Sequence, residues 1–272
     1  MSNLATRAIT GIIFVLVIVG AILSSPYAFI GLFALIAALM LTEFYQLMNK
    51  HQGVKLNLPV NITGGLLLFT GSALFSLGIV KAQIFLLYLA YLIILWVSEL
   101  YRKKPEPIRN WAYALLGQIY IALPFALLNI IGFSESTYKP ALLLGLFVFI
   151  WLNDTGAYLV GSRIGKRRLF ERISPKKSWE GFWGGIGFAM LGGYLFSLIF
   201  TDLTIWQWVG FGAIVALFST WGDLSESLLK RTIGVKDSGK MLPGHGGMLD
   251  RFDSVLLACP AAVIYLELIL SL

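Results

Sequence analysis

The sequence predicts an all-α, polytopic membrane protein, because apolar segments recur along its whole length and charged residues are scarce. Of the 272 residues, 58% are hydrophobic and 13% are charged, and the mean hydropathy is +0.81. In a soluble domain, about a quarter of the residues are usually charged. Backbone that faces lipid must satisfy its own hydrogen bonds, so we expect the apolar segments to form helices.

We expect about nine transmembrane helices, since apolar runs of about 20 residues are long enough to cross a bilayer. The first run follows Arg7 and has some features of a secretory signal peptide. It lacks an A-x-A-like cleavage site and further spans follow at once, so we predict a retained helix. The predicted spans are 8–24, 27–48, 60–79, 82–100, 111–132, 140–161, 181–200, 205–229 and 251–271.

The basic residues indicate how these helices are oriented. When the loops are assigned to alternate sides of nine spans, 19 of the 21 Lys and Arg residues fall on one side, and Lys81 and Lys139 fall on the other. Cytoplasmic loops are enriched in Lys and Arg, so we expect a cytoplasmic N-terminus and an external C-terminus. The net charge of +7 therefore reflects membrane topology, and we expect no nucleic-acid partner.

The two parts of the chain differ in their loops. Residues 1–100 contain four spans with short connections, and we expect them to form a scaffold. Residues 101–272 contain five spans and the longer polar loops, so we expect the catalytic region there, at the cytoplasmic side of the cell membrane. Cys259 is the only cysteine, which excludes a disulfide within the chain and a cysteine metal site.

Six acidic residues lie in or near the predicted spans, where a charged side chain is costly and usually functional. Three of them lie close to span ends, and we expect these three, Glu43, Glu99 and Glu267, to be solvated or ion-paired. The others lie deeper and need another explanation. They are Asp154, Asp223 and Glu226.

Residues three apart are neighbours on a helix, so Glu226 joins Asp223 on one face of span eight, and Asp250 joins Asp253 at the start of span nine. Capping of the helix start is an alternative role for Asp250. Carboxylates at one depth repel each other unless a cation neutralises them, and hard oxygen ligands suit Mg²⁺ or another divalent cation. A second cation is compatible with this pattern. The expected ligands are Asp223, Asp250 and Asp253, with Asp154 and Glu226 as second choices.

The loop between spans eight and nine has a composition that suits phosphate. Glycines at 244, 246 and 247 allow backbone N–H groups to approach a ligand. The stretch GVKDSGKM differs from a Walker A loop only at its last position. Met241 cannot bind magnesium and a transmembrane helix precedes the loop, so we do not expect a Walker A site. The basic residues of the loop are Lys230, Arg231, Lys236 and Lys240.

A longer motif surrounds this loop. It reads Ser-Leu-Leu-Lys-Arg at 227–231, Lys-Asp-Ser-Gly at 236–239, Leu-Pro-Gly-His-Gly-Gly at 242–247 and Asp-Arg-Phe-Asp at 250–253. This motif resembles the signature of the phosphatidate cytidylyltransferases, the membrane enzymes that make CDP-diacylglycerol. Ser-Pro-Lys-Lys-Ser-Trp-Glu-Gly at 174–181 and the Asn153-Asp154 stretch are similar to segments of that family.

The resemblance implies a metal-dependent transfer of a cytidylyl group from CTP to phosphatidate in phospholipid biosynthesis, with release of pyrophosphate. No predicted span or loop offers a base-reading pocket, so the identity of the nucleotide as a cytidine nucleotide is inferred from the resemblance alone. The residues implied to act in the reaction are Asp223, Lys230, Arg231, Lys236, Asp237, His245, Asp250 and Asp253. Those implied to bind substrate are Ser174, Lys176, Lys177, Ser227, Gly246, Gly247 and Arg251.

Two other function classes share some of these features. A secondary transporter also has intramembrane carboxylates, but its site should face both sides of the membrane. The polar groups here cluster on one side. A CDP-alcohol phosphotransferase, another membrane lipid phosphotransferase, needs a D-x-x-D-G run continued by further aspartates, which the sequence lacks.

Two further patterns have more than one interpretation. Seven basic residues between Arg163 and Lys177 suit either a topology anchor or an interfacial segment. In the second case, Lys176 and Lys177 would steer the anionic phosphatidate headgroup. Small residues at 181, 185, 189 and 193 form a stripe that suits close packing of helices, either within the chain or in a homodimer.

Overall fold

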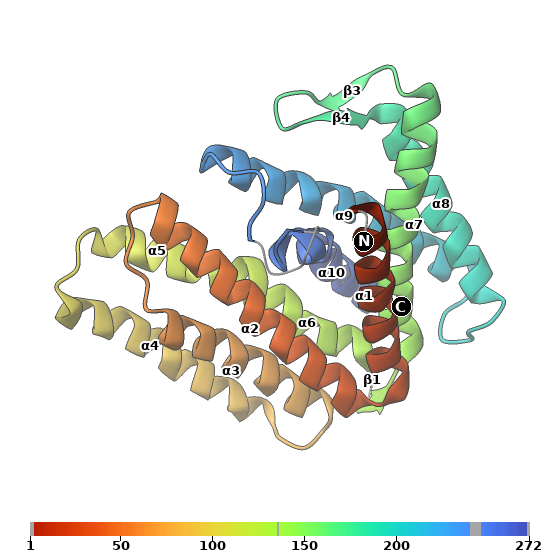
Figure 1. Ribbon diagram of the computed structural model, residues 1–272. Helices are drawn as coiled ribbons and strands as arrows, with labels where there is room; N and C mark the ends of the chain where they lie inside the picture. The colour runs from red at the N-terminus through yellow and green to blue at the C-terminus, as the bar shows by residue number, and fades with distance from the viewer. Residues whose placement is uncertain (1–2, 135, 240–245, 271–272) are drawn as a thin grey trace. The chain divides into compact units, whose positions relative to one another are not determined.

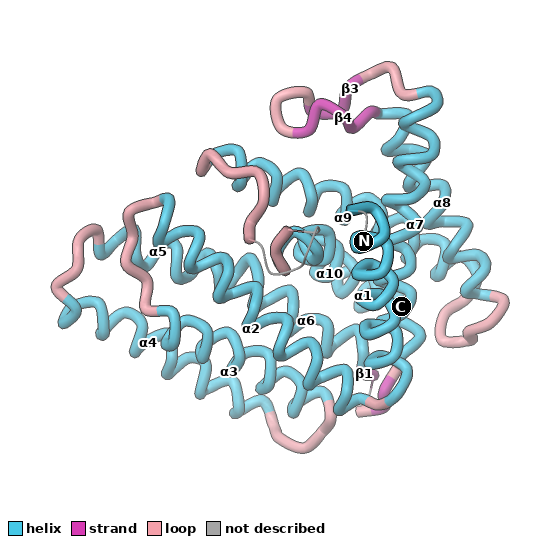
Figure 2. The backbone as a smooth tube through the Cα atoms, in the orientation of Figure 1, coloured by secondary structure: helices cyan, strands magenta, loops and turns pink. Residues whose placement is uncertain are grey.

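The computed structural model describes residues 3–134, 136–239 and 246–270, and their side chains from residue 9 onward. Helices dominate these ranges and two short β-hairpins accompany them (Figure 1, Figure 2). Contacts divide the chain into two compact units. Unit 1 contains Met1–Tyr138 and Asp237–Arg251, and unit 2 contains Lys139–Lys236 and Phe252–Leu272. These units are defined by contacts, and the division at residue 100 between a scaffold and a catalytic region stays a prediction.

Unit 1 is built from the N-terminal helices. α2 begins where the Ser25 side chain accepts the Ala28 N–H at 3.1 Å, and Pro26 occupies the first helical position. A π-helical turn, η2, interrupts the last long helix of the unit. The elements are α1 (Asn3–Ser24), α2 (Pro26–His51), α3 (Leu58–Ser76), η1 (Ala82–Ile84), α4 (Phe85–Arg102), α5 (Pro107–Gly117), η2 (Gln118–Ala122), α6 (Leu123–Gly132), β1 (Phe133–Ser134) and β2 (Thr137–Tyr138).

The core of unit 1 combines aromatic packing with a buried polar network. The Tyr45 hydroxyl donates to the carbonyl of Ala114 at 2.9 Å and accepts from the Gln118 amide at 2.9 Å. The same amide donates to the carbonyl of Asn61 at 2.8 Å. Because buried polar groups are costly unless they are paired, this network fixes how α2, α3 and η2 pack.

Unit 2 holds the longer helices of the C-terminal half. α10 begins in unit 1 and belongs to unit 2 from Phe252 onward. α9 starts with a capping box in which Thr204 and Gln207 bond each other's backbone. The elements are α7 (Pro140–Ile164), β3 (Arg168–Phe170), β4 (Ser174–Ser178), α8 (Trp179–Ser197), α9 (Ile205–Thr232) and α10 (Leu249–Leu270).

The small-residue stripe on α8 packs within the chain. A Cβ atom on Gly181 would lie 2.8 Å from the carbonyl oxygen of Ala157, and one on Gly185 would lie 2.7 Å from that of Asn153. A Cβ on Gly193 would collide with the backbone of Trp208 on α9. The predicted close packing is therefore confirmed, and glycine is required where these backbones approach each other.

Six helical segments within the described residues are long and apolar enough to cross a membrane. They support a multi-pass membrane protein. Each of the nine predicted spans falls on a helix. The part of α1 with described side chains, Ile9–Ser24, is apolar but shorter than the others, and the helices that overlap spans 181–200 and 205–229 do not qualify by length and composition. The qualifying segments are Pro26–His51, Leu58–Ser76, Ala82–Arg102, Pro107–Gly132, Pro140–Ile164 and Leu249–Leu270.

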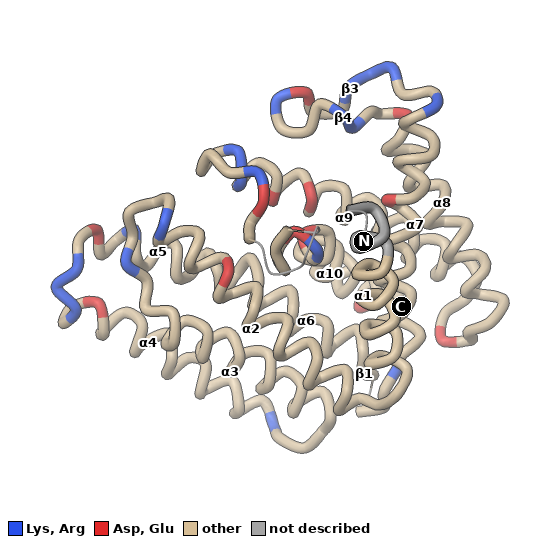
Figure 3. The backbone as a smooth tube through the Cα atoms, viewed as in Figure 1, with Lys and Arg blue, Asp and Glu red and all other residues tan. Residues whose placement is uncertain are grey.

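The β3–β4 hairpin is an addition to the helical architecture that the sequence analysis did not predict. Its strands pair antiparallel, with Arg168 opposite Ser178 and Phe170 opposite Ser174. The hairpin occupies the basic loop after α7, and Figure 3 shows Lys and Arg residues along it. The loop between two predicted spans is thus an ordered element rather than a simple connection.

Candidate functional site

Asp223, a predicted metal ligand, lies half-buried on α9. Its Oδ2 atom lies 2.5 Å from the ammonium nitrogen of Lys177, which comes from β4. Its Oδ1 atom accepts a hydrogen bond from the Ser227 hydroxyl one helical turn later, at 3.3 Å. Asp223, a predicted metal ligand, therefore contacts Lys177 and Ser227, two predicted substrate-binding residues, within unit 2.

Asp253 lies half-buried on α10 and interacts electrostatically with Asp223 and Asp154. α9 and α10 approach closely here, because a Cβ on Gly222 would lie only 2.6 Å from the carbonyl oxygen of Asp253. The three aspartates thus belong to one electrostatic environment. Nevertheless, the described part of the chain contains no group of three or more His, Cys, Asp or Glu side chains arranged to hold a metal ion.

Glu226 and Lys230 form an ion pair one turn apart on α9. Glu226 has no exposed surface and Lys230 is buried beside it. Removing one partner of a buried ion pair is strongly destabilising, because it leaves an uncompensated charge in the protein interior. This pairing favours a structural role for both residues, although the sequence analysis considered one for metal and the other for the reaction.

The environment of Glu43 on α2 differs from the one predicted from the sequence. This residue was expected to be solvated or ion-paired, but it is only 7% exposed and accepts hydrogen bonds. Its Oε2 atom accepts the backbone N–H groups of Met248 at 2.7 Å and Leu249 at 3.4 Å, and its Oε1 atom accepts the Ser238 hydroxyl. A Cβ atom on Gly247 would collide with this carboxylate. Glu43 therefore binds residues on both sides of the undescribed range 240–245 in the loop between α9 and α10, residues 233–248, which we call the motif loop.

Sequence reasoning missed this role because the partners of Glu43 lie about 200 residues away along the chain. A buried acid in an apolar helix was the available signal.

Glu99, by contrast, fulfils its expectation: it pairs with Arg102 at 2.7 Å and accepts from the Asn110 amide. Glu267 is exposed on α10.

Asp250, at the start of α10, contacts the same loop. Its Oδ2 atom accepts the backbone N–H of Ser238 at 3.0 Å and that of Gly247 at 2.8 Å. Gly246 has a φ of +81°, and a Cβ there would lie 2.5 Å from this oxygen. Capping of the helix start was the alternative to a metal role for Asp250. The N–H groups that Asp250 accepts belong to the loop before α10 rather than to the first turn of the helix, so these contacts tie the loop to α10, and both predicted roles stay predictions.

The remaining predicted residues lie at the surface or outside the described ranges. His245, with Lys240, Met241 and the glycine at 244, falls in the undescribed range 240–245. Ser174 is half-buried in β4. The Arg231 guanidinium donates to the carbonyl of Val235 at 3.2 Å. The exposed predicted residues are Lys176, Arg231, Lys236, Asp237 and Arg251.

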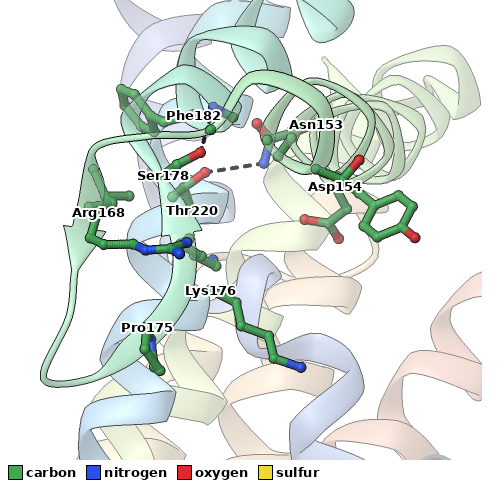
Figure 4. Close-up of a pocket in the computed structure, with 16 residues that line it drawn as sticks. Asn153, Asp154, Arg168, Pro175, Lys176, Ser178, Phe182 and Thr220 are labelled. Carbon is green, nitrogen blue, oxygen red and sulfur yellow. Dashed lines mark hydrogen bonds between the residues drawn. The ribbon is translucent and has the colours of Figure 1, made fainter.

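A pocket of about 570 Å³ lies in unit 2 between α7, the β3–β4 hairpin, the start of α8 and α9 (Figure 4). Asn153 forms part of its wall, is 1% exposed, and donates to the hydroxyls of Ser219 and Thr220 at 3.0 and 3.2 Å. This amide therefore links α7 to α9 at the pocket. The charged residues of the lining are Asp154, Arg168, Lys176 and Lys177.

Comparison with known proteins identifies the family of this chain. The model of the cytidylyltransferase family matches residues 5–269. The chain belongs to this family. Membership covers both units, since the match runs through the motif loop and through the hairpin.

Among the curated relatives of this cytidylyltransferase-family chain are proteins named phosphatidate cytidylyltransferase from three staphylococci. The Staphylococcus aureus (strain COL) protein is 44% identical over 153 residues, which are 55% of this chain and 56% of the relative. The Staphylococcus epidermidis (strain RP62A) protein is 41% identical over 153 residues. The Staphylococcus saprophyticus protein is 40% identical over 151 residues. The chain thus spans about half the length of the curated relatives it matches.

In this cytidylyltransferase-family protein, two anchors hold the hairpin beside the pocket. The Glu180 carboxylate accepts the backbone N–H groups of Lys166 at 3.0 Å and Arg167 at 3.3 Å. These bonds, after one from its own backbone N–H, lower the pKa of Glu180. Phe170 packs edge-to-face against Trp221 of α9, with ring centroids 5.7 Å apart.

Proposed function

We propose that the protein is a phosphatidate cytidylyltransferase. It transfers a cytidylyl group from CTP to phosphatidate and releases CDP-diacylglycerol and pyrophosphate. The observation that carries this proposal is the 44% identity to a protein of that name, within a family match that spans residues 5–269. The motif at 227–253 supports the same activity.

In the proposed reaction, an oxygen of the phosphatidate phosphate attacks the α-phosphorus of CTP, and the bond to pyrophosphate breaks. The lipid phosphate is itself the nucleophile, so the protein needs no nucleophilic side chain. Its contribution is to position the two phosphates and to neutralise their charge. The exposed cations Arg231 and Lys236, at the end of α9 and just beyond it, are suited to this task.

The chemistry of the acidic residues fits a divalent cation such as Mg²⁺. Asp223 and Asp253 offer carboxylate oxygens, and a cationic group already lies against the Asp223 carboxylate, namely the Lys177 ammonium. We therefore assign Asp223 and Asp253 as the residues that would hold the metal, with Asp154 as a further candidate. A bound Mg²⁺ would supply charge neutralisation at the phosphates. Asp250 shapes the motif loop in this scheme.

We further propose nine spans with a cytoplasmic N-terminus, which places the motif loop and the hairpin at the cytoplasmic side of the cell membrane. The distribution of Lys and Arg supports this topology. CTP is an aqueous cytoplasmic compound, and phosphatidate reaches the site from the bilayer. A homodimer is compatible with this arrangement.

The test of the proposed function uses purified protein in detergent with phosphatidate, Mg²⁺ and each of the four nucleoside triphosphates. We expect pyrophosphate release with CTP or dCTP far above that with the others, and none after chelation of the metal. In oriented vesicles, CTP should be used only on the face that carries the motif loop. Equal use of ATP would contradict the cytidylyl specificity. Solute transport without nucleotide turnover would replace the enzyme with a transporter.

A further inference from the structure

Arg168 is a cation of the pocket in unit 2 to which the sequence analysis gave no individual role. It begins β3, and its side chain extends into the pocket (Figure 4). Among the described residues, no carboxylate forms an ion pair with Arg168. An arginine that faces a cavity without an acidic partner is suited to an anionic ligand, because its planar guanidinium matches the oxygens of a phosphate.

The other charges of the pocket direct an anion towards the same place. Lys177 is held by Asp223 at 2.5 Å, so its charge is already balanced. Lys176 is exposed and lines the pocket together with Arg168. Asp154 interacts with Asp253 and lies on the wall formed by α7. The hairpin side of the pocket is therefore the side with cations available to a ligand.

The apolar part of the lining indicates which kind of phosphate ligand the pocket takes. Ala157, Tyr158, Leu169 and Phe182 contribute to its walls. The pocket also adjoins the C-terminal end of α7, one of the helices that are long and apolar enough to span a membrane. A ligand with a phosphate at one end and an apolar body at the other matches both parts of the lining.

We propose that this pocket binds the phosphate headgroup of a membrane lipid, with Arg168 as its principal phosphate ligand and Lys176 as a second cation. The proposal rests on the proposed function, since phosphatidate is the lipid with a terminal phosphate that the reaction would use. CTP is the other source of phosphate. The assignment commits the pocket to the lipid and leaves the nucleotide phosphates to cations elsewhere.

The test measures binding without turnover. Purified full-length protein in detergent, without CTP or metal, is titrated with phosphatidate or with phosphatidylcholine of the same acyl chains, and bound lipid is counted by native mass spectrometry. A separate titration uses CTP alone. The variants are Arg168→Gln, Arg168→Lys and, as a matched control, Arg172→Gln. Arg172 lies in the same hairpin and is exposed, but it does not line the pocket.

We expect Arg168→Gln to weaken phosphatidate binding about ten- to a hundredfold, the effect of losing a charged hydrogen-bond donor. Arg168→Lys should recover part of the affinity, because it keeps the charge and loses the planar geometry. Arg172→Gln should bind like the unaltered protein, and phosphatidylcholine should bind weakly to all variants.

Two outcomes would overturn the assignment. Equal losses of phosphatidate affinity in Arg168→Gln and Arg172→Gln would show that the effect comes from the general charge of the hairpin. Loss of CTP binding with unchanged phosphatidate binding would make this a nucleotide site. Failure of the proposed function is distinct, because it would show as lipid binding that depends on Arg168 without any CTP-dependent product.

Discussion

The ammonium nitrogen of Lys177 lies 2.5 Å from Oδ2 of Asp223, so the β3–β4 hairpin supplies the counter-charge of a half-buried carboxylate on α9. The two residues are 46 positions apart along the chain. The contact joins the 174–181 motif of the hairpin to α9, one helical turn before Ser227, where the second motif begins. Any cation that binds Asp223 competes with this lysine.

Asp223→Asn should abolish most turnover while the protein stays folded. The neutral amide binds a divalent cation much more weakly than a carboxylate does, and we expect the rate of CDP-diacylglycerol formation to fall at least about a hundredfold. The measurement is the initial rate with CTP and phosphatidate, beside a thermal unfolding curve. Asp202→Asn is the matched control, since Asp202 also pairs with a lysine, Lys139, at 3.0 Å. Full activity of Asp223→Asn would remove this residue from the site.

Gly185→Ala should destabilise unit 2. The added methyl group would lie 2.7 Å from the backbone oxygen of Asn153 and would collide with its side-chain oxygen. Overpacking of this kind costs about 1–3 kcal/mol. Gly187→Ala is the control on the same helix, because nothing lies within 4 Å of a Cβ atom there. We expect the thermal midpoint in detergent to fall by several degrees for the first variant only, and equal midpoints would contradict the packing described here.

Glu43→Gln should loosen the motif loop from α2. Glutamine keeps one acceptor oxygen but no negative charge, so the hydrogen bonds from the Met248 and Leu249 N–H groups become weaker neutral bonds even when that oxygen faces them, and the Ser238 hydroxyl loses its acceptor, at a cost of about 1–3 kcal/mol. Hydrogen exchange at these two amides should accelerate. Glu267→Gln, which alters an exposed acid of α10, should leave the exchange unchanged. Unaltered protection in Glu43→Gln would show that the carboxylate is dispensable for the loop.

The hairpin anchor at Glu180 should depend on pH. Hydrogen bonds to the ionised carboxylate lower the pKa of Glu180 below its ordinary value of 4.5. The stabilisation is therefore fully present above that value, and it disappears as the pH falls through the lowered pKa. Protection of the Lys166 and Arg167 amides, corrected for intrinsic exchange, should be constant from neutral pH to about 4.5 and then decrease. In Glu180→Gln, protection should already be low at neutral pH and should not change as the pH falls through this range.

The helices could be predicted from the sequence because each apolar run carries its own signal. The four-residue spacing of small residues likewise predicts the packing of α8, since the pattern repeats with the helix. The β3–β4 hairpin could not be predicted, because its strands are short and carry mostly polar and charged residues. Strand recognition depends on alternation over longer runs.

The candidate site could be predicted in composition but not in pairing. The chemistry of Asp223 and Lys177 is evident in the sequence, yet nothing in their positions reveals that they contact each other. Asp250 and Glu43 illustrate the same limit. Asp250 lies in the first turn of α10 and Glu43 lies inside α2, and only the three-dimensional arrangement shows that each accepts backbone N–H groups of the motif loop.

The long-range contacts of Glu43 also constrain the biogenesis of the protein. Translation delivers α2 to the membrane early, whereas its partner Ser238 emerges 195 residues later. During that interval the Glu43 side chain lacks the hydrogen bonds that it accepts in the folded chain, and an unpaired acid in an apolar helix is costly. A nascent chain that stops before Ser238 would carry this acid without its native partners. Unit 1 is therefore completed only near the end of synthesis, and prematurely terminated chains would expose a ready signal for membrane quality control.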